Sequence, residues 1–262
     1  MVKQCLENLR MSELVLLCPG QGAQKAGMGK AWFDASGAAK SIFERADELL
    51  GDSLGLPLSK ICFEDPNSEI NKTNVSQPAI YTCSIAAWHG LREEGLAGDI
   101  KATAGLSLGE YSALHLAGVF SFEDGLSLVA KRGALMQDAA EAQSSTMVAV
   151  MGDDDAILKL CDEARGSDIL VPANFNAPGQ IVLSGSVEAC ERAVSLSGDT
   201  ELRATPLSVA GAFHSPFMQS AADAMAEALD GVAFNNPKID VWSNVTGELH
   251  DAERIKEHLV EQ

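Results

Sequence analysis

Strand-like and helix-like hydrophobic patterns alternate along the first 140 residues of the chain. Short continuous apolar runs, typical of buried strands, are followed by segments in which apolar residues recur every three or four positions, as on one face of a helix. This alternation favours a mainly parallel sheet covered by helices. The predicted strands are residues 14–18 and 100–104, and the predicted helices are residues 38–50, 77–91, 108–117 and 121–140.

The pattern becomes more compact between residues 147 and 208. Its order is strand, helix, strand, strand, helix, strand, which is the order of a ferredoxin-like unit. Helix and strand patterns of the first kind return afterwards, so we expect a small βαββαβ subdomain at residues 144–209, inserted into a large α/β domain of residues 1–143 and 210–262. The segments predicted within the small unit, and the helices predicted after it, are residues 147–151, 154–164, 169–172, 181–184, 187–196, 202–209, 217–229 and 251–262.

Composition narrows the class of protein. The 262 residues, 46% of them hydrophobic, are enough for a sizeable core, and the net charge of −18 argues against nucleic acid as a partner. No apolar run is long enough for a membrane span. The six cysteines are scattered without the spacing of a zinc site or a disulfide framework, and the first ten residues have no feature of a secretory or transit peptide.

The segment Gly105-Leu106-Ser107-Leu108-Gly109 has the pattern of a nucleophile turn between a strand and a helix. Glycine is needed on both sides of the serine because a Cβ there would collide with the neighbouring strand or helix. The turn would expose the Ser107 hydroxyl and aim the Leu108 backbone N–H at an oxyanion forming beside it. The alternative is a chance occurrence of G-x-S-x-G.

A serine nucleophile needs a base, and His214 is the candidate with a suitable setting among five histidines. It follows the strand-like residues 202–209 and precedes a helix start, at a sheet edge where active-site loops gather. The alternative is a histidine that caps a helix. His115 is expected to point away from the serine, and His250 and His258 are expected on the surface.

Arg132 lies among apolar neighbours at helical spacing, so its guanidinium is predicted to be half-buried and to require an anion. The anion is either an internal Asp or Glu or, more specifically, a substrate carboxylate held by a bidentate bridge. Gln21 lies in a glycine-rich turn after the first strand. Its backbone N–H could complete an oxyanion hole with that of Leu108, although such a turn is also typical of a plain tight loop.

Seven segments together resemble one family, the malonyl-CoA:acyl carrier protein transacylases of type II fatty acid synthesis, which are related to the acyltransferase domains of polyketide synthases. They run in the family's order from about residue 14 to residue 262. The matching segments are Pro19-Gly20-Gln21-Gly22-Ala23-Gln24, Ser76-Gln77-Pro78-Ala79, Gly105 to Ala113, Arg132-Gly133 with Met136-Gln137, Asn176-Ala177-Pro178-Gly179-Gln180, Gly211-Ala212-Phe213-His214-Ser215 and Ser243-Asn244-Val245.

The resemblance implies an acyltransferase in which Ser107 accepts the acyl group and His214 is its base. It implies that Arg132 binds the malonyl carboxylate and that the backbone N–H groups of Gln21 and Leu108 hold the oxyanion. It also implies an α/β-hydrolase-like core with the ferredoxin-like insert, malonyl-CoA and acyl carrier protein as partners, and neither a metal nor a bound cofactor. We expect a monomer.

Further expectations come from single positions. A backbone carbonyl orients the histidine in this family, and Gln262 best matches the residue that supplies it. Phe213 resembles the malonyl-selective form. Leu106 replaces the histidine that is common before the nucleophile, a variant that resembles the plastid-type branch, so we expect a plastid stroma location, with the bacterial cytoplasm as the alternative.

The family's usual C-terminal segment has no counterpart after Gln262. That segment normally packs against the core, so we expect lower stability or activity than in a full-length relative. Two other functions remain open. One is a serine esterase or thioesterase of the α/β-hydrolase type, which would need an acidic third residue before its histidine. The other is an inactive, C-terminally truncated fragment that only binds the carrier protein.

Overall fold

The computed structural model describes residues 13–96 and 98–262, which form two compact units. Unit 1 consists of the described residues up to Gly133 together with Met225–Gln262, and unit 2 is Ala134–Ala224. The domain boundaries expected from the sequence, with the small subdomain at residues 144–209, stay a prediction.

Unit 1 is built on a three-stranded parallel sheet. Its strands are β1 (Glu13–Cys18), β2 (Asp99–Gly105) and β7 (Asp240–Val241), in the order β1-β2-β7. The predicted α/β fold with a parallel sheet is therefore confirmed. Cys18 pairs with Gly105 at the last position of the β1–β2 ladder, so the turns that follow these two strands leave the sheet at the same edge. Ligands of open parallel sheets bind at this carboxyl edge.

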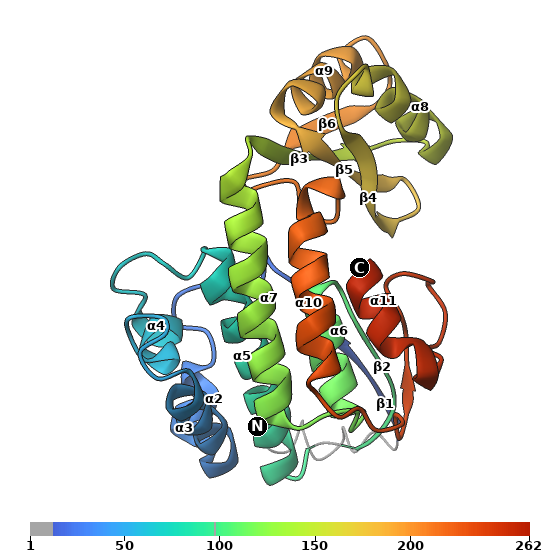
Figure 1. Ribbon diagram of the computed structural model, residues 1–262. Helices are drawn as coiled ribbons and strands as arrows, with labels where there is room; N and C mark the ends of the chain where they lie inside the picture. Colours follow the sequence, from blue (N-terminus) through green and yellow to red (C-terminus); the bar gives the residue numbers. More distant parts are fainter. Residues whose placement is uncertain (1–12, 97) are drawn as a thin grey trace, which may run out of the picture. The chain divides into compact units, whose positions relative to one another are not determined.

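Helices pack around this sheet, and α6 lies alongside β1 and β2 (Figure 1). The helices predicted at residues 38–50, 77–91, 108–117 and 121–140 are all present, within a few residues at their ends. Unit 1 contains α2 (Lys30–Ala35), α3 (Gly37–Leu50), α4 (Leu58–Glu64), α5 (Thr73–Glu93), α6 (Leu108–Leu116), the first part of α7 (Phe122–Ala142), the last part of α10 (Gln219–Asp230), the 3-10 turn η2 (Ala252–Arg254) and α11 (Ile255–Glu261).

The start of α5 differs from the expectation. The sequence suggested a start behind Ser76 with Pro78 in the first turn, whereas the helix begins at Thr73 and contains Pro78 within it. A proline inside a helix removes one N–H from the helical ladder. The earlier start brings Thr73 and Gln77 onto the helix, and both side chains are fully buried.

Unit 2 contains a four-stranded antiparallel sheet in the order β4-β5-β3-β6. Helices α8 and α9 begin at side-chain caps from Asp153 and Ser186 and cover one face of the sheet, where their apolar residues form a buried core with the strands (Figure 1). Unit 2 begins with the last part of α7 and ends with the first part of α10. The elements between them are β3 (Ser145–Met151), α8 (Asp154–Arg165), β4 (Leu170–Ala177), β5 (Gln180–Ser186), α9 (Val187–Ser197), β6 (Arg203–Pro206) and the 3-10 turn η1 (Pro216–Met218).

The strand expected at residues 202–209 is shorter than predicted, because β6 ends at Pro206. Proline has no N–H to donate to a ladder, and among the described residues one further backbone bond follows, from Leu207 N to Met147 O. The apolar side chains of Leu207 and Val209, which suggested a longer strand, instead pack against the buried cluster around Met147. Within residues 13–96 and 98–262, no helix is both long and apolar enough to cross a membrane.

Candidate active site

Ser107 lies in the sharp turn between β2 and α6, with φ 50° and ψ −110°, a conformation that a non-glycine residue rarely adopts. The two glycines make the turn possible. A Cβ on Gly105 would collide with the carbonyl group of Gly109, and a Cβ on Gly109 would collide with the carbonyl oxygen of Cys18. This agrees with the steric reason given from the sequence for both glycines.

The turn after β1 packs directly against the serine turn. Leu106 N donates to Cys18 O at 3.2 Å, and a Cβ on Gly20 would lie 2.5 Å from the Leu106 carbonyl oxygen. Gln21 is the next residue after Gly20, and its side-chain Nε2 donates to Thr73 Oγ1 at 3.3 Å. Among the described residues, the backbone N–H groups of Gln21 and Leu108 donate to no acceptor. Both therefore remain available to an anion.

Arg132 contacts the nucleophile candidate directly, although only 5% of the residue is exposed. Its Nη2 donates to Ser107 Oγ at 3.0 Å and to Gln262 Oε1 at 2.8 Å, and its Nη1 donates to Gln77 Oε1 at 3.0 Å. The guanidinium also lies 5.6 Å from the centre of the Tyr111 ring. All three acceptors are uncharged, and no described carboxylate forms a salt bridge with Arg132.

Burial lowers the pKa of Arg132 below its ordinary value, while Tyr111 and Glu110 oppose this shift. An arginine retains its proton at neutral pH in proteins, so the charge persists inside the protein without a directly bound counter-ion. The sequence left two anions open for Arg132, an internal Asp or Glu and a substrate carboxylate. Among the described residues, no Asp or Glu pairs directly with Arg132.

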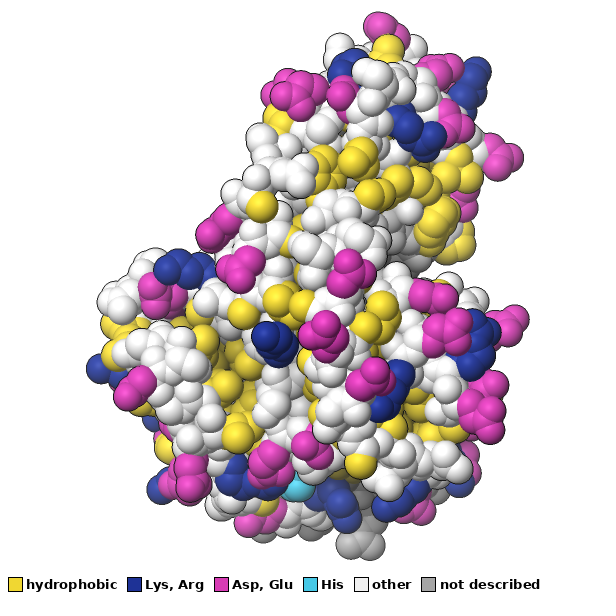
Figure 2. All heavy atoms as spheres, in the orientation of Figure 1, with side chains coloured by type: hydrophobic (Ala, Val, Ile, Leu, Met, Phe, Trp, Pro, Cys, Tyr) yellow, Lys and Arg dark blue, Asp and Glu magenta, His cyan; other side chains and the backbone are white. Residues whose placement is uncertain are grey.

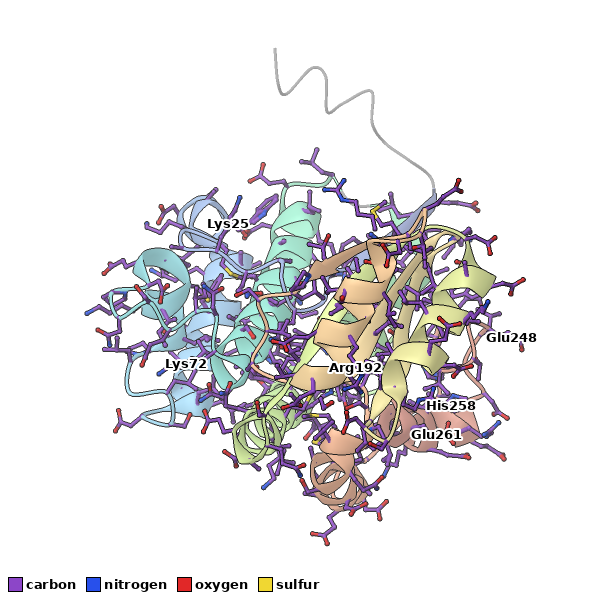
Figure 3. All side chains as sticks on the ribbon, turned by 90° about the horizontal axis from the view of Figure 1, so that it is seen from above. Lys25, Lys72, Arg192, Glu248, His258 and Glu261 are labelled. Atoms are coloured by element: carbon purple, nitrogen blue, oxygen red, sulfur yellow. The ribbon has the colours of Figure 1, made fainter. Side chains whose placement is uncertain are left out.

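A second polar cluster is centred on Glu110, which is fully buried on α6. Its Oε1 accepts from His250 Nε2 at 2.6 Å and from Asn244 N at 3.1 Å, and its Oε2 accepts from Gln262 Nε2. The ring of His250 approaches that of His258, with 3.3 Å between their Nδ1 atoms. Figure 3 labels His258 on α11.

The expectation that His250 and His258 are surface residues is therefore wrong. The His250 side chain is fully buried and only 3% of His258 is exposed. The physical reason is the carboxylate of Glu110, which is buried on α6 and needs hydrogen-bond donors around it. His115 does face away from the serine, as predicted, since its Nδ1 lies 3.1 Å from Phe120 O.

Asn244 holds the serine turn from the side of β7. Its Oδ1 accepts from Ser107 N at 2.7 Å, and its Nδ2 donates to Gly105 O at 2.5 Å. From the sequence, Asn244 stood out only as part of a motif, and Glu110 and Gln77 were assigned no role. Their signal was weak, because a lone polar residue in a helix or loop has no characteristic spacing.

In unit 2, His214 has φ 56°, so it is a second non-glycine residue with a strained backbone. The preceding Phe213 is buried, and its carbonyl oxygen accepts from Ser184 Oγ at 2.6 Å. Ser215 caps η1 with Pro216 in the first turn, as the sequence predicted for the helix start after the histidine. The described residues have only four non-glycine positions with positive φ, and the two residues expected to form the catalytic pair are among them.

The acyl transferase domain family matches residues 15–262. The malonyl CoA-acyl carrier protein transacylase of Bacillus subtilis is 41% identical over 256 residues, which is 96% of this chain and 79% of that protein. This chain belongs to the family of malonyl CoA-acyl carrier protein transacylases. The predicted family and the predicted enzyme class, acyltransferase, are thus confirmed.

Solved structures agree with this family. The transacylase of Clostridium perfringens superposes with a TM-score of 0.88 and 38% identity, covering 95% of this chain and 78% of that one. A malonyl-transacylase in complex with a type II PKS acyl-carrier protein has a TM-score of 0.88 and 37% identity, covering 95% and 80%. B. subtilis and C. perfringens are bacteria, so these relatives do not support the expected plastid location and favour the bacterial alternative.

No group of three or more His, Cys, Asp or Glu side chains in the described part of this acyl transferase is placed to hold a metal ion. Among the described residues, Ser107 is hydrogen-bonded by the Arg132 guanidinium at Oγ and by the Asn244 side chain at its backbone N–H. Burial raises the pKa of the nearby Cys18 thiol to about 12, so this group is a poor nucleophile at neutral pH.

We expect Gly105→Ala to lower the free energy of unfolding by about 1–3 kcal/mol, because the new methyl group would displace the carbonyl of Gly109. Chemical denaturation measures the effect. The control is Gly37→Ala in α3, where a Cβ would meet only Glu93 Oε1 at 3.5 Å, and its stability should be unchanged or slightly higher. Equal stability of both variants would contradict the steric account of the turn.

We expect Asn244→Ala to lower the free energy of unfolding by about 1–3 kcal/mol, because the Ser107 N–H and the Gly105 carbonyl would lose their partner. Asn71→Ala is the control, since Asn71 makes an exposed bond to Gln24 and its loss should change stability by less than about 0.5 kcal/mol. Denaturant curves of the two variants that coincide would refute the clamping role of Asn244.

Proposed function

We propose that this enzyme transfers a malonyl group from malonyl-CoA to the phosphopantetheine thiol of an acyl carrier protein, through a malonyl-Ser107 intermediate. The names of its relatives support this reaction, and the complex with a type II PKS acyl-carrier protein supports the partner. The product would supply fatty acid or polyketide synthesis. The bacterial cytoplasm is the proposed location and a monomer the proposed state.

The observation that carries the proposal is the 3.0 Å hydrogen bond from Arg132 Nη2 to Ser107 Oγ. No carboxylate of the described residues forms a salt bridge with this guanidinium. One methylene group separates the carboxylate of a malonyl group from its thioester carbon. A cation in contact with the nucleophile therefore fits an acyl group that has a carboxylate at this short distance. Acetyl groups lack it and would leave the buried charge uncompensated.

In the first half-reaction, His214 accepts the proton of Ser107 as Oγ attacks the thioester carbonyl carbon. The free N–H groups of Leu108 and Gln21 would hold the resulting oxyanion, which matches their lack of other described acceptors. The intermediate then collapses, the C–S bond breaks, and His214 returns the proton to the departing CoA thiolate. Ser107 is left as the malonyl ester.

In the second half-reaction, the phosphopantetheine thiol gives its proton to His214 and attacks the ester carbonyl. The C–O bond to Ser107 breaks, and the proton passes to Oγ. The backbone carbonyl of Gln262 is proposed to orient His214, as in the family, and Phe213 to favour malonyl over branched acyl groups. The strained backbone of His214 is consistent with a residue held for such a role.

The alternatives are less well supported. An esterase or thioesterase would release the acyl group to water and has no use for a cation beside its nucleophile, whereas Arg132 is bonded to Ser107. A fragment that only binds the carrier protein would not need the strained serine turn. Thioester assays with and without carrier protein distinguish transfer from hydrolysis, and a burst of enzyme acylation excludes the binding fragment.

The finer fold assignments are also proposals. The element order of unit 2 and its sheet order, β4-β5-β3-β6, support a ferredoxin-like subdomain. The parallel sheet with a serine turn after β2 supports an α/β-hydrolase-like core. Carrier-protein docking would need a local basic patch, and on the face in Figure 2 the Lys and Arg side chains are scattered among many Asp and Glu.

We expect Ser107→Ala to abolish the malonyl adduct that intact-protein mass spectrometry detects after exposure to malonyl-CoA. The control is Ser112→Ala, which removes a buried hydroxyl from the same helix without removing a described hydrogen bond. That variant should still form the adduct. Transfer by Ser107→Ala at the wild-type rate would rule out the serine intermediate.

We expect Arg132→Ala to reduce the preference for malonyl-CoA over acetyl-CoA, measured as the ratio of kcat/KM values, by about 100-fold, because charge-assisted bonds to the carboxylate are lost. Arg132→Lys should give an intermediate ratio, since it keeps the charge but not the bidentate geometry. An unchanged ratio in a folded Arg132→Ala variant would contradict the carboxylate role.

A further inference from the structure

Gln262 links the Arg132 guanidinium to the buried carboxylate of Glu110. Its Oε1 accepts from Arg132 Nη2 at 2.8 Å, and its Nε2 donates to Glu110 Oε2. Glu110 itself contacts neither Ser107 nor Arg132 through a described hydrogen bond or salt bridge. A charged group with no exposed surface therefore lies one side chain away from the reacting groups.

We propose that Glu110 is a positioning residue that fixes the direction of the Gln262 amide, so that an acceptor always faces Arg132 and holds its guanidinium beside Ser107. This inference rests on the proposed function and adds to it a residue that controls the recognition of the substrate carboxylate.

The pattern of hydrogen-bond donors and acceptors fixes the orientation of the Gln262 amide. A carboxylate only accepts hydrogen bonds and a guanidinium only donates them, whereas a glutamine amide does one at each end. Between these two groups, Gln262 has a single satisfied orientation, with Nε2 toward Glu110 and Oε1 toward Arg132. If Glu110 were a donor, the amide would turn over and present N–H groups to a guanidinium that cannot accept them.

The other described partners of Glu110 also donate to its carboxylate. Asn244 N and His250 Nε2 both approach Oε1, so each oxygen of the carboxylate has at least one donor. Asn244 also bonds Ser107 N, so the same carboxylate is connected to the serine turn. The charge of Glu110 opposes the effect of burial on the pKa of Arg132, which fits a role in stabilising the cation.

The first variant is Glu110→Gln, which keeps the shape of the side chain but replaces one acceptor by a donor. We expect the malonyl-to-acetyl ratio of kcat/KM to fall by about tenfold or more, mainly through a higher KM for malonyl-CoA, because Arg132 loses its fixed position. Ser112→Ala, also buried on α6, is the matched control and should keep the wild-type ratio.

The second variant separates polarity from general damage to the helix. In the double variant Glu110→Gln/Gln262→Glu, the amide introduced at position 110 can donate to the carboxylate introduced at position 262, which in turn accepts from Arg132. The amide oxygen at position 110 can still accept from Asn244 and His250. We expect the double variant to unfold at a higher temperature than Glu110→Gln alone. Equal or lower thermal stability of the double variant would overturn the polarity argument.

A crystal structure of Glu110→Gln gives a readout that does not depend on activity. We expect the Arg132–Gln262 bond to be lost and the guanidinium to move from Ser107. An unchanged Arg132 with both bonds intact would overturn the proposal, whatever the kinetics. If the wild type forms no malonyl-Ser107 while Arg132 still moves in the variant, only the proposed function fails.

Discussion

A buried positive charge without a directly bound counter-ion is the constraint on which the described site depends. Arg132 is held by three uncharged oxygens, from Gln77, Ser107 and Gln262, and each comes from a different element of unit 1. Helix α5 begins early enough to supply Gln77, α11 ends with Gln262 next to it, and the serine turn supplies the third acceptor. These elements must all be in place before the guanidinium can be buried, since an unsatisfied charge in the interior is costly.

The backbone of the serine turn departs from its relaxed form, with φ 50° at Ser107. Its strain is maintained by the backbone contacts of Gly105 and Gly109 and by the two bonds of Asn244. The cost of such a conformation is of order 1–3 kcal/mol per residue, which the surrounding packing must offset. The matching ends of β1 and β2 explain why this turn and the glycine-rich turn of Gln21 meet at one edge.

The features that could be predicted from the sequence are those with a regular hydrophobic spacing or a clear steric requirement. The helices of unit 1, the element order of unit 2 and the reason for Gly105 and Gly109 follow from spacing and side-chain size, and the burial of Arg132 follows from its apolar helical neighbours. The extent of β6 was overestimated, because Leu207 and Val209 are apolar for packing rather than for pairing. His250 and His258 were misplaced because their burial depends on Glu110, more than one hundred positions away in the chain.

The hydrogen bonds at Ser107 also bear on the entropy of substrate binding. Asn244 fixes its backbone N–H, and Arg132 occupies one acceptor position of its hydroxyl. A free serine side chain loses rotamer freedom when it is ordered. Here that ordering has already taken place in the folded protein, so in the proposed reaction the acyl group would meet an oxygen whose rotation is already restricted and would not need to supply the free energy to restrict it.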